Sequence, residues 1–277
     1  MVNGAEKFVG KDKYTFDDLV EIMQILRRPD GCPWDREQTH KTIRQNFIEE
    51  TYEVVEAIDN NDKALLCEEL GDVLMQVVFH SVISQEQNEF NINDVIKGLC
   101  TKLIFRHPHI FSNIVAEDSG TVLDNWDKLK TIEKHHKSTG EKIDSVSRAM
   151  PSLMRAQKIG GKCRKEGFDF NNAEDALIKL KEESNELMTE FNANNVEGTF
   201  EEAGDLLLAA VNLVRLCGVD SEKALYMACE KYISRYKAME SYMAENNLDI
   251  NKLTDDEKNE CWIEAKKRVY QNNSSLI

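Results

Sequence analysis

Apolar residues recur every three or four positions through most of the chain, which is the spacing of one face of an α-helix. The first such stretch contains Leu19, Ile22, Met23 and Leu26. Further helices are expected at about 39–60, 62–88, 93–107 and 121–136. Only 4 prolines and 13 glycines interrupt the 277 residues, so few positions break a helix. The pattern therefore predicts an all-α protein.

The order of motifs in the first half of the chain returns in the second half. EETYEVVEAI is echoed by EESNELMTEF, and EELGDVLMQVV by EEAGDLLLAAV. One constant offset carries Glu50 to Glu183 and Glu69 to Glu202, and we call positions related by this offset equivalent. Two copies are too few for a solenoid, so we predict two tandem helical-bundle domains that arose by internal duplication. Their expected bounds are 1–136 and 151–277, with a linker over 137–150.

Each copy carries two pairs of carboxylates at helical spacing, with fifteen residues between the pairs. The pairs are Glu50 and Glu53 with Glu69 and Asp72, and Glu183 and Glu186 with Glu202 and Asp205. Residues three apart share a helix face, and the interval is long enough for a turn into an antiparallel helix. Four carboxylates that converge repel one another unless a hard dication binds them, and all-oxygen ligands suit Mg²⁺ or Mn²⁺. The spacing therefore predicts a metal site in each copy.

The carboxylate pairs also have two simpler interpretations, as solvated surface charges and as a helix cap. Isolated E-x-x-E pairs are common on solvated helix faces. Thr199 and Glu202 also have the spacing of a capping box, in which Glu202 would only cap its helix. The recurrence of the whole set at equal spacing favours metal binding over both.

A Lys-x-x-x-Arg motif and a Trp-x-x-x-Lys motif follow the carboxylates in each copy. The residues are Lys102, Arg106, Trp126 and Lys130 in the first copy and Lys231, Arg235, Trp262 and Lys266 in the second. Taken singly, such cations are typical of a solvated face and such tryptophans of a core. Their recurrence in the same order favours phosphate binding by the cations and stacking on a base by tryptophan.

The two copies differ where a nucleoside would bind. Asn212 lies seven residues after Asp205, on the same helix face, where it can hydrogen-bond a ribose or a base. The first copy has Phe79 at that position, and it follows Arg106 with two histidines where the second copy has Tyr236. These differences leave three roles open for the first copy, which is catalytic, narrower in specificity, or mainly structural.

Composition and charge exclude several classes of protein. The net charge of −15 opposes binding to nucleic acid, and no apolar run approaches the length that a membrane span requires. The seven cysteines form no C-x-x-C pair, and we expect them to be reduced core residues of a cytoplasmic protein. No glycine-rich phosphate loop occurs. Glu37-x-x-His40 and Glu133-x-x-His136 have the spacing of di-iron ligands, but they lie in polar stretches and neither recurs, so no di-iron site is expected.

With these motifs in place, the chain resembles the MazG family, the nucleoside triphosphate pyrophosphohydrolases of bacteria. The resemblance covers nearly the whole chain. It is carried by GCPWDREQTH, EETYEVVEAI, EELGDVLMQVVFH, RHPHIF, LMRAQKIG and EGFDF, in the family's order. The family's E-x-x-E and E-x-x-D hallmark stands in both copies, on the carboxylates named above.

The resemblance implies all-α domains, a homodimer, Mg²⁺ dependence, and hydrolysis of NTPs or dNTPs to the monophosphate and pyrophosphate as nucleotide-pool housekeeping. It also implies that the second copy carries most of the activity, with Lys231 and Arg235 on the phosphates and Trp262 and Lys266 enclosing the nucleotide. Glu182 or Glu183 is expected to act as general base. Two alternatives are a nucleotide-sensing or partner-binding module without turnover, and a structural helical dimerisation protein.

Overall fold

The computed structural model describes residues 2–112, 129 and 138–274, and the side chains as far as residue 270. Among these residues every regular element is a helix, which confirms the all-α prediction. The chain divides into two compact units, 1–133 and 134–277. Each unit is described by itself.

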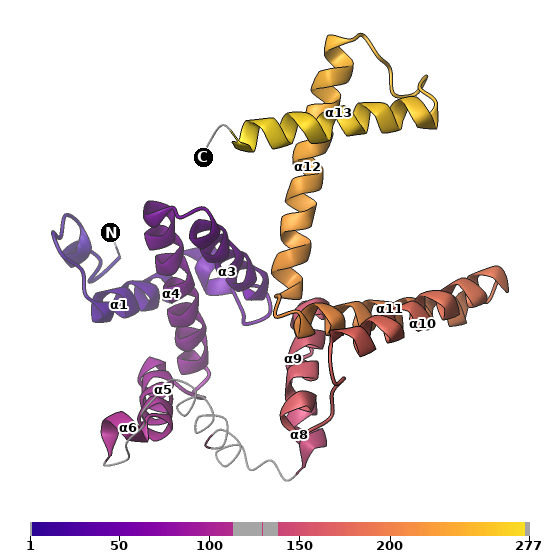
Figure 1. Ribbon diagram of the computed structural model, residues 1–277. Helices are drawn as coiled ribbons and strands as arrows, with labels where there is room; N and C mark the ends of the chain where they lie inside the picture. The colour runs from indigo at the N-terminus through magenta and orange to yellow at the C-terminus, as the bar shows by residue number, and fades with distance from the viewer. Residues whose placement is uncertain (1, 113–128, 130–137, 275–277) are drawn as a thin grey trace. The chain divides into compact units, whose positions relative to one another are not determined.

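Unit 1 is built on a pair of long helices, α3 and α4, which lie side by side (Figure 1). The helices of the unit are η1 (Glu6–Phe8), α1 (Phe16–Arg27), α2 (Pro33–Glu37), α3 (Arg44–Asp59), α4 (Lys63–Glu86), α5 (Ile92–Arg106) and α6 (Pro108–Phe111). The core lies between α1 and the C-terminal half of α4, where Met23, Val78 and Phe79 are buried together with Ile43. This packing leaves the N-terminal half of α4 to face α3.

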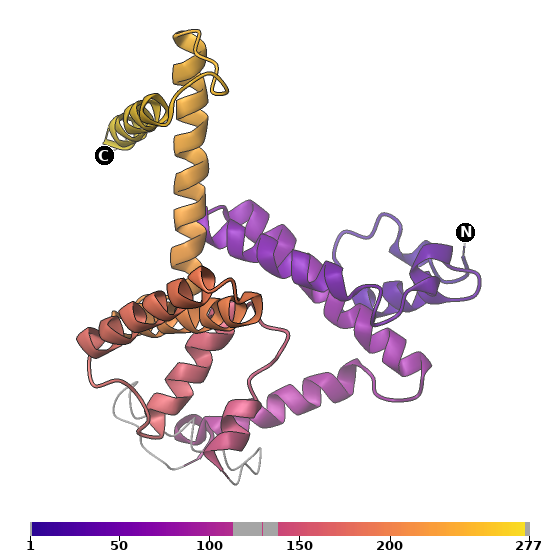
Figure 2. The ribbon, with the colours of Figure 1, turned by 90° about the vertical axis from the view of Figure 1, so that its right-hand side faces the viewer.

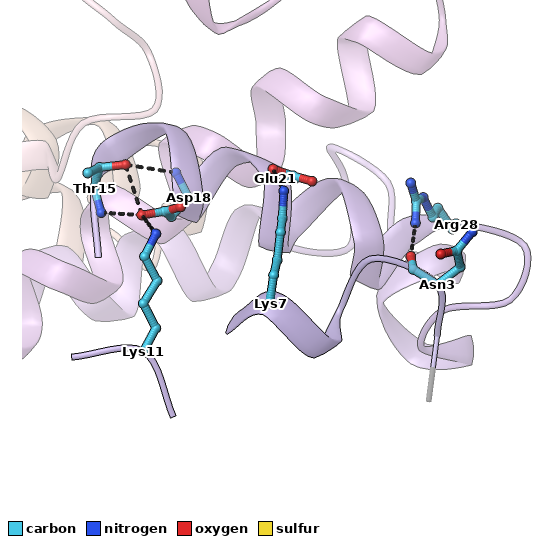
Figure 3. Close-up of polar contacts among 7 residues, drawn as sticks. All are labelled: Asn3, Lys7, Lys11, Thr15, Asp18, Glu21 and Arg28. Atoms are coloured by element: carbon cyan, nitrogen blue, oxygen red, sulfur yellow. Dashed lines mark hydrogen bonds and ion pairs between the residues drawn. The ribbon is translucent and has the colours of Figure 1, made fainter. Parts of the chain in front are cut away.

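The segment before α1 is fastened to that helix by exposed polar contacts (Figure 3). Lys7 pairs with Glu21, and Lys11 with Asp18, each at 2.6 Å between nitrogen and oxygen. Asp18 also forms a capping box with Thr15, the N-cap of α1. The helix therefore begins at Phe16, behind a threonine cap.

Unit 2 repeats the long helical pair as α10 and α11, which lie side by side in both views (Figures 1 and 2). Its helices are α8 (Thr139–Asp144), α9 (Ser152–Lys165), α10 (Ala173–Asn192), α11 (Val196–Leu216), α12 (Ser221–Glu245) and α13 (Asp255–Ser274). The helix α12 leaves the end of α11 and runs away from the pair, and α13 packs across its far end (Figure 2). Buried Met239 and Met243 meet Cys261 and Ala265 at that contact.

The duplication extends to the turn inside each long pair. Asn61 and Asn194, at equivalent positions, both adopt the left-handed conformation, with φ of 54° and 55°. Asparagine tolerates this conformation better than most residues do, and it ends each first helix. The next residue then caps the second helix, because Asp62 and Asn195 accept hydrogen bonds from its first-turn amides. The turn therefore fixes the register of the two helices in the same way in both copies.

Several expectations from the sequence differ from the structure. The helix expected from about residue 39 begins at Arg44, because 39–43 form a turn that buries Ile43. The segment 137–150 contains α8, and Lys142 of α8 pairs with Glu166 at 2.6 Å. The helix expected at 121–136 lies outside the described residues except for Leu129, which is helical. The domain bounds themselves stay a prediction.

The expectation for the cysteines was wrong in part. All seven are free and Cys261 is buried, but Cys67, Cys100, Cys217 and Cys229 are exposed instead of buried in a core. They occupy apolar helical stretches whose outer faces remain uncovered in the single chain.

Candidate metal and nucleotide site

Three carboxylates converge between the paired helices of unit 2. Glu183 and Glu186 come from α10 and Glu202 from α11, and each offers an oxygen within 4.8 Å of the others. The antiparallel turn at Asn194 brings the two helices back along each other, so that these residues, far apart in sequence, meet. The structure therefore groups three of the four predicted ligands of this copy.

Unit 1 holds an equivalent cluster of Glu50, Glu69 and Asp72, with oxygens again within 4.8 Å of one another. The fourth predicted ligand of each copy lies beside its cluster. Glu53 lies close enough to raise the pKa of Glu50 and of Glu69, and Asp205 lies close enough to raise the pKa of Glu202. Each cluster thus has a fourth carboxylate in reach.

One acid of each cluster is more deeply buried than a leucine near it. Glu69 and Glu183 expose only 7% and 6% of their surface. Leu74 and Leu207, at equivalent positions, expose 40% and 60%. Burying a charge is unfavourable unless an opposite charge compensates it, whereas exposing apolar surface is typical of a face that another chain covers. Each helical pair therefore places its acids where a cation belongs.

Burial and repulsion between carboxylates raise the pKa values of several carboxyl groups in these clusters. Burial, reinforced by Asp72, raises the pKa of Glu50, and burial together with Glu53 raises that of Glu69. In unit 2, burial raises the pKa of Glu186 and of Glu202, aided by their carboxylate neighbours. Bound divalent cations reverse such shifts, because they favour the ionised carboxylates.

A lysine makes the two clusters differ in charge. The Nζ of Lys179 lies 2.6 Å from Glu183 Oε1 and 2.7 Å from Glu182 Oε1. Its hydrogen bond lowers the pKa of Glu183. The equivalent position of the first copy holds Asn46, so the unit 1 cluster has no such lysine there. The sequence analysis did not single out Lys179, although its spacing of four from Glu183 was visible.

The capping interpretation of Glu202 was wrong. The helix α11 begins at Val196 behind the Asn195 cap, so Thr199 and Glu202 both lie inside it. Thr199 Oγ1 donates to the carbonyl oxygen of Asn195 instead of capping a helix. Glu202 is therefore free to face Glu183 and Glu186.

The predicted cations and aromatic residues stand on other helices. Lys231 and Arg235 lie on α12, and Trp262 and Lys266 on α13, where the Trp262 ring lies 5.1 Å from that of Tyr232 between centroids. Because α12 runs away from the α10–α11 pair (Figure 2), Lys231 stands on a helix that leaves the carboxylates of its own unit. Lys102 and Arg106 lie likewise on α5, and Trp126 and Lys130 lie outside the described residues.

A pocket of about 430 Å³ opens beside α11 in unit 2. Leu208 and Asn212 of α11 line it, one and two turns after Asp205. The remaining lining residues are Ile159, Gly160, Cys163, Phe168, Asp169, Phe170 and Arg215. The sequence analysis found Asn212 but missed Asp169 and Arg215, although Asp169 repeats Asp35 of the first copy at the offset of the CPWD and EGFDF motifs.

His40 belongs to a histidine pair. Its Nδ1 lies 2.7 Å from Nδ1 of His80, with the rings stacked, and its Nε2 lies 3.1 Å from the hydroxyl oxygen of buried Ser84. His40 therefore has a buried flank, contrary to expectation, but Glu37 is exposed and takes no part. Glu133 and His136 lie outside the described residues.

Comparison with known proteins agrees with the duplicated carboxylate hairpins. Residues 38–111 and 171–239 each match the MazG nucleotide pyrophosphohydrolase domain, and these two ranges hold all eight predicted metal ligands. The chain belongs to the MazG family. It is 41% identical to the nucleoside triphosphate pyrophosphohydrolase of Escherichia coli (strain K12) over 255 residues, which are 91% of this chain and 97% of that protein.

Other members of the MazG family share the tandem length. The nucleoside triphosphate pyrophosphohydrolase/pyrophosphatase MazG of Thermotoga maritima is 40% identical, with 91% of this chain and 95% of that protein covered. The uncharacterized protein YabN of Bacillus subtilis (strain 168) is 38% identical over 91% of this chain, but the match covers only 52% of that protein. The match thus spans nearly the whole Thermotoga protein but only about half of the longer YabN protein.

Proposed function

We propose that this protein hydrolyses nucleoside triphosphates, NTPs or dNTPs, to nucleoside monophosphate and pyrophosphate. The observation that carries the proposal is the group of Glu183, Glu186 and Glu202, whose oxygens lie within 4.8 Å of one another around buried Glu183. The names of the E. coli and Thermotoga relatives support it. A housekeeping role on the nucleotide pool is part of the proposal.

Glu183, Glu186, Glu202 and Asp205 would hold the cofactor, which we propose to be Mg²⁺, with Mn²⁺ as the alternative. The cluster fits a hard dication because every donor is a carboxylate oxygen and burial disfavours unpaired charge there. Such an ion, when bound, supplies positive charge to the triphosphate and acidity to a water. Glu50, Glu53, Glu69 and Asp72 form the second set.

The remaining roles belong to side chains of this chain. Glu182 or Glu183 takes the proton of the attacking water as general base, and the ammonium of Lys179 orients both carboxylates. Lys231 and Arg235 neutralise the charge that develops on the leaving pyrophosphate, while Trp262 and Lys266 enclose the nucleotide. In the first copy, Lys102, Arg106, Trp126 and Lys130 hold the matching places.

Identification of the products tests this function. The purified chain, incubated with Mg²⁺ and each of the eight standard (d)NTPs, is expected to release monophosphate and pyrophosphate in equal amounts, as followed by ³¹P NMR. Chelation of the metal with EDTA is expected to stop the reaction. Release of diphosphate and inorganic phosphate would contradict the proposal.

We also propose that the protein is a homodimer. The helices α5 and α12 project from their units with exposed apolar residues at helical spacing. These residues include Val95, Leu99 and Leu103 on α5 and Leu225, Tyr232 and Tyr236 on α12. A second copy that covers these faces would remove apolar surface from water and place its own Lys231 near the carboxylates of α10 and α11.

The remaining predictions concern membranes, cellular location and nucleic acid. In the part of the chain that the structure describes, no helix combines the length and apolarity needed to cross a bilayer. The seven free cysteines support a cytoplasmic location, where thiols stay reduced. With a net charge of −15, nucleic acid is not an expected partner.

The alternative function, nucleotide binding without turnover, concerns the first copy, which keeps a carboxylate cluster but differs in the nucleoside pocket. There the aromatic ring of buried Phe79 takes the place of Asn212, and the guanidinium of Arg27 lies 5.3 Å from its centre. A variant that lacks the second copy's metal ligands and still binds nucleotide saturably, without forming product, would assign this role to the first copy.

The raised pKa values of the first cluster predict a pH dependence. A carboxyl whose pKa is higher in the folded state than in the unfolded state contributes stability that is fully present below its unfolded pKa, near 4.5. This contribution is lost as the pH rises through the folded pKa. In EDTA, the melting temperature of the wild type is therefore expected to fall between about pH 4.5 and 8 more than that of Glu50→Gln/Glu69→Gln. Parallel melting curves across this range would contradict the prediction.

A further inference from the structure

The pocket beside α11 contains a network of buried polar groups that the proposed reaction does not use. Arg215 NH1 and NH2 donate to the two carboxylate oxygens of Asp169, at 3.0 and 2.6 Å. The side chains expose only 8% and 13% of their surface. The guanidinium lowers the pKa of Asp169, so the pair is ionised and held rigidly in two parallel hydrogen bonds.

Arg215 also determines the orientation of the side-chain amide of Asn212. The NH2 group of Arg215 donates to Oδ1 of Asn212 at 3.2 Å. A guanidinium has donors only, so it can pair with the amide oxygen of asparagine and never with the amide nitrogen. The Nδ2 group of Asn212, with two N–H donors, is therefore the part left for a ligand in the pocket.

The contact leaves no room for a side chain at position 160. A Cβ at Gly160 would lie 2.8 Å from Arg215 Nε and 2.8 Å from Asn212 Oδ1. The backbone of α9 thus packs directly against both groups, and Arg215 Nε is buried there without a hydrogen-bond partner. A residue larger than glycine at position 160 would therefore collide with both the Asn212 amide and the Arg215 guanidinium.

The first copy has lost this arrangement. Phe79 takes the place of Asn212, and Val82 stands at the position equivalent to Arg215, both of them buried. The arginine that approaches Phe79 is Arg27, which comes from α1 and pairs with Glu86 at 2.7 Å. The network therefore belongs to the second copy.

The position of the pocket fits the nucleoside half of a triphosphate. Asn212 follows Asp205 by seven residues, which is about 10 Å along the axis of α11. Leu208, one turn after Asp205, already lines the pocket, and apolar Ile159, Phe168 and Phe170 complete its walls. Phosphates bound near the carboxylates would thus leave the nucleoside to enter an apolar pocket with a few oriented polar groups, as is usual for ligand sites.

We infer that Arg215, held by Asp169, is a positioning residue that orients the amide NH2 group of Asn212 into this pocket. The second copy would then select nucleotides by a hydrogen-bond acceptor on the nucleoside. The inference rests on the proposed function. The acceptor is an oxygen atom, either a ribose hydroxyl or the 4-carbonyl of a uracil base. The selectivity of the enzyme is therefore set by the orientation of one amide.

Substrate analogues test the inference. With the wild type, kcat/KM is measured for UTP, for its 2′-deoxy and 3′-deoxy forms, and for the triphosphate of 2-pyrimidinone riboside, which lacks the 4-carbonyl of uracil. Loss of the acceptor that Asn212 reads is expected to lower kcat/KM by about tenfold or more, because a buried donor is left unpaired. A drop with the deoxy forms identifies the ribose, and a drop with the base analogue identifies the carbonyl.

Variants then show whether Arg215 acts through Asn212. Asn212→Asp keeps an acceptor for Arg215 but removes the donors, so the preference is expected to vanish through a higher KM with kcat within about threefold. The exposed Asn192→Asp, at the end of α10, controls for the charge. Arg215→Met/Asp169→Asn removes the Arg215–Asp169 ion pair without leaving a buried charge, and the variant is expected to keep its helical circular dichroism. The ratio of kcat/KM between the triphosphates is expected to fall toward one.

Each outcome decides the inference. It is overturned if the wild type treats all four triphosphates alike, or if the folded Arg215→Met/Asp169→Asn variant keeps the full preference. If the wild type shows no turnover, the proposed function fails, and dissociation constants for the same four triphosphates, from calorimetry with Mg²⁺, provide the ratios instead. An unchanged ratio in these constants would overturn the inference as well.

Discussion

Replacing Glu183 and Glu202 with glutamine is expected to lower pyrophosphate release by about a hundredfold or more. Glutamine keeps the shape of each side chain but removes two of the negative charges that would hold the cation. Glu202→Gln relieves repulsion where burial raises the pKa of Glu202, and Glu183→Gln leaves Lys179 paired with Glu182, so the metal-free protein is expected to fold. Steady-state release of pyrophosphate at saturating Mg²⁺, with circular dichroism of the variant, measures the effect.

The duplication supplies a matched control for that experiment. Glu50→Gln/Glu69→Gln makes the same change at the equivalent positions of the first copy, in a cluster that lacks a counterpart of Lys179 and whose neighbouring pocket position is filled by Phe79. This variant is expected to keep most of the activity. If the two double variants lose activity equally, the assignment of catalysis to the second copy is wrong, and near-wild-type turnover by Glu183→Gln/Glu202→Gln would remove that site from the reaction altogether.

Placing a charge on the exposed face of α12 is expected to convert a dimer into a monomer. Ile233 exposes 45% of its surface in the single chain and lies three residues before Tyr236 of the proposed interface. Ile233→Glu adds a charge that a solvated surface tolerates within about 0.5 kcal/mol, but that a buried interface does not. Light scattering is expected to show a mass that falls from twice 31.8 kDa toward 31.8 kDa.

Activity should fall with the mass, by about tenfold or more, if Lys231 and Arg235 serve the carboxylates of the partner copy. Ile104→Glu, which follows Lys102 by two residues on α5 and exposes 51%, tests the corresponding face of the first unit. Ser234→Glu adds the same single charge at an exposed position of α12 on the side opposite Tyr232, and it is the control. A wild type that is already monomeric, or an Ile233→Glu variant that stays dimeric, would disprove the proposed interface.

Much of the fold and of the metal clusters was predictable, because both depend on local spacing. Residues three apart must share a helix face, and a short turn must return the chain antiparallel. Glu183, Glu186 and Glu202 therefore meet as the pattern requires, and so do Glu50, Glu69 and Asp72. The repeat also determines the caps, since Asp62 and Asn195 occupy equivalent positions and act alike.

Other features depend on which residues of distant segments come into contact. The helix pattern did not show that Arg215 binds Asp169, 46 residues away, or that Gly160 of α9 presses on Asn212. It also allowed a capping box at Glu202, because a cap and a helix interior share the same spacing until the true cap, Asn195, is located. The carboxylate pairs, the duplication and the all-α class follow from periodicity along one chain. The pairing of Lys179 with Glu182 and Glu183 also follows from local spacing on α10. The orientation of the Asn212 amide and the uncovered apolar faces depend instead on packing between segments, which the spacing along one chain does not specify.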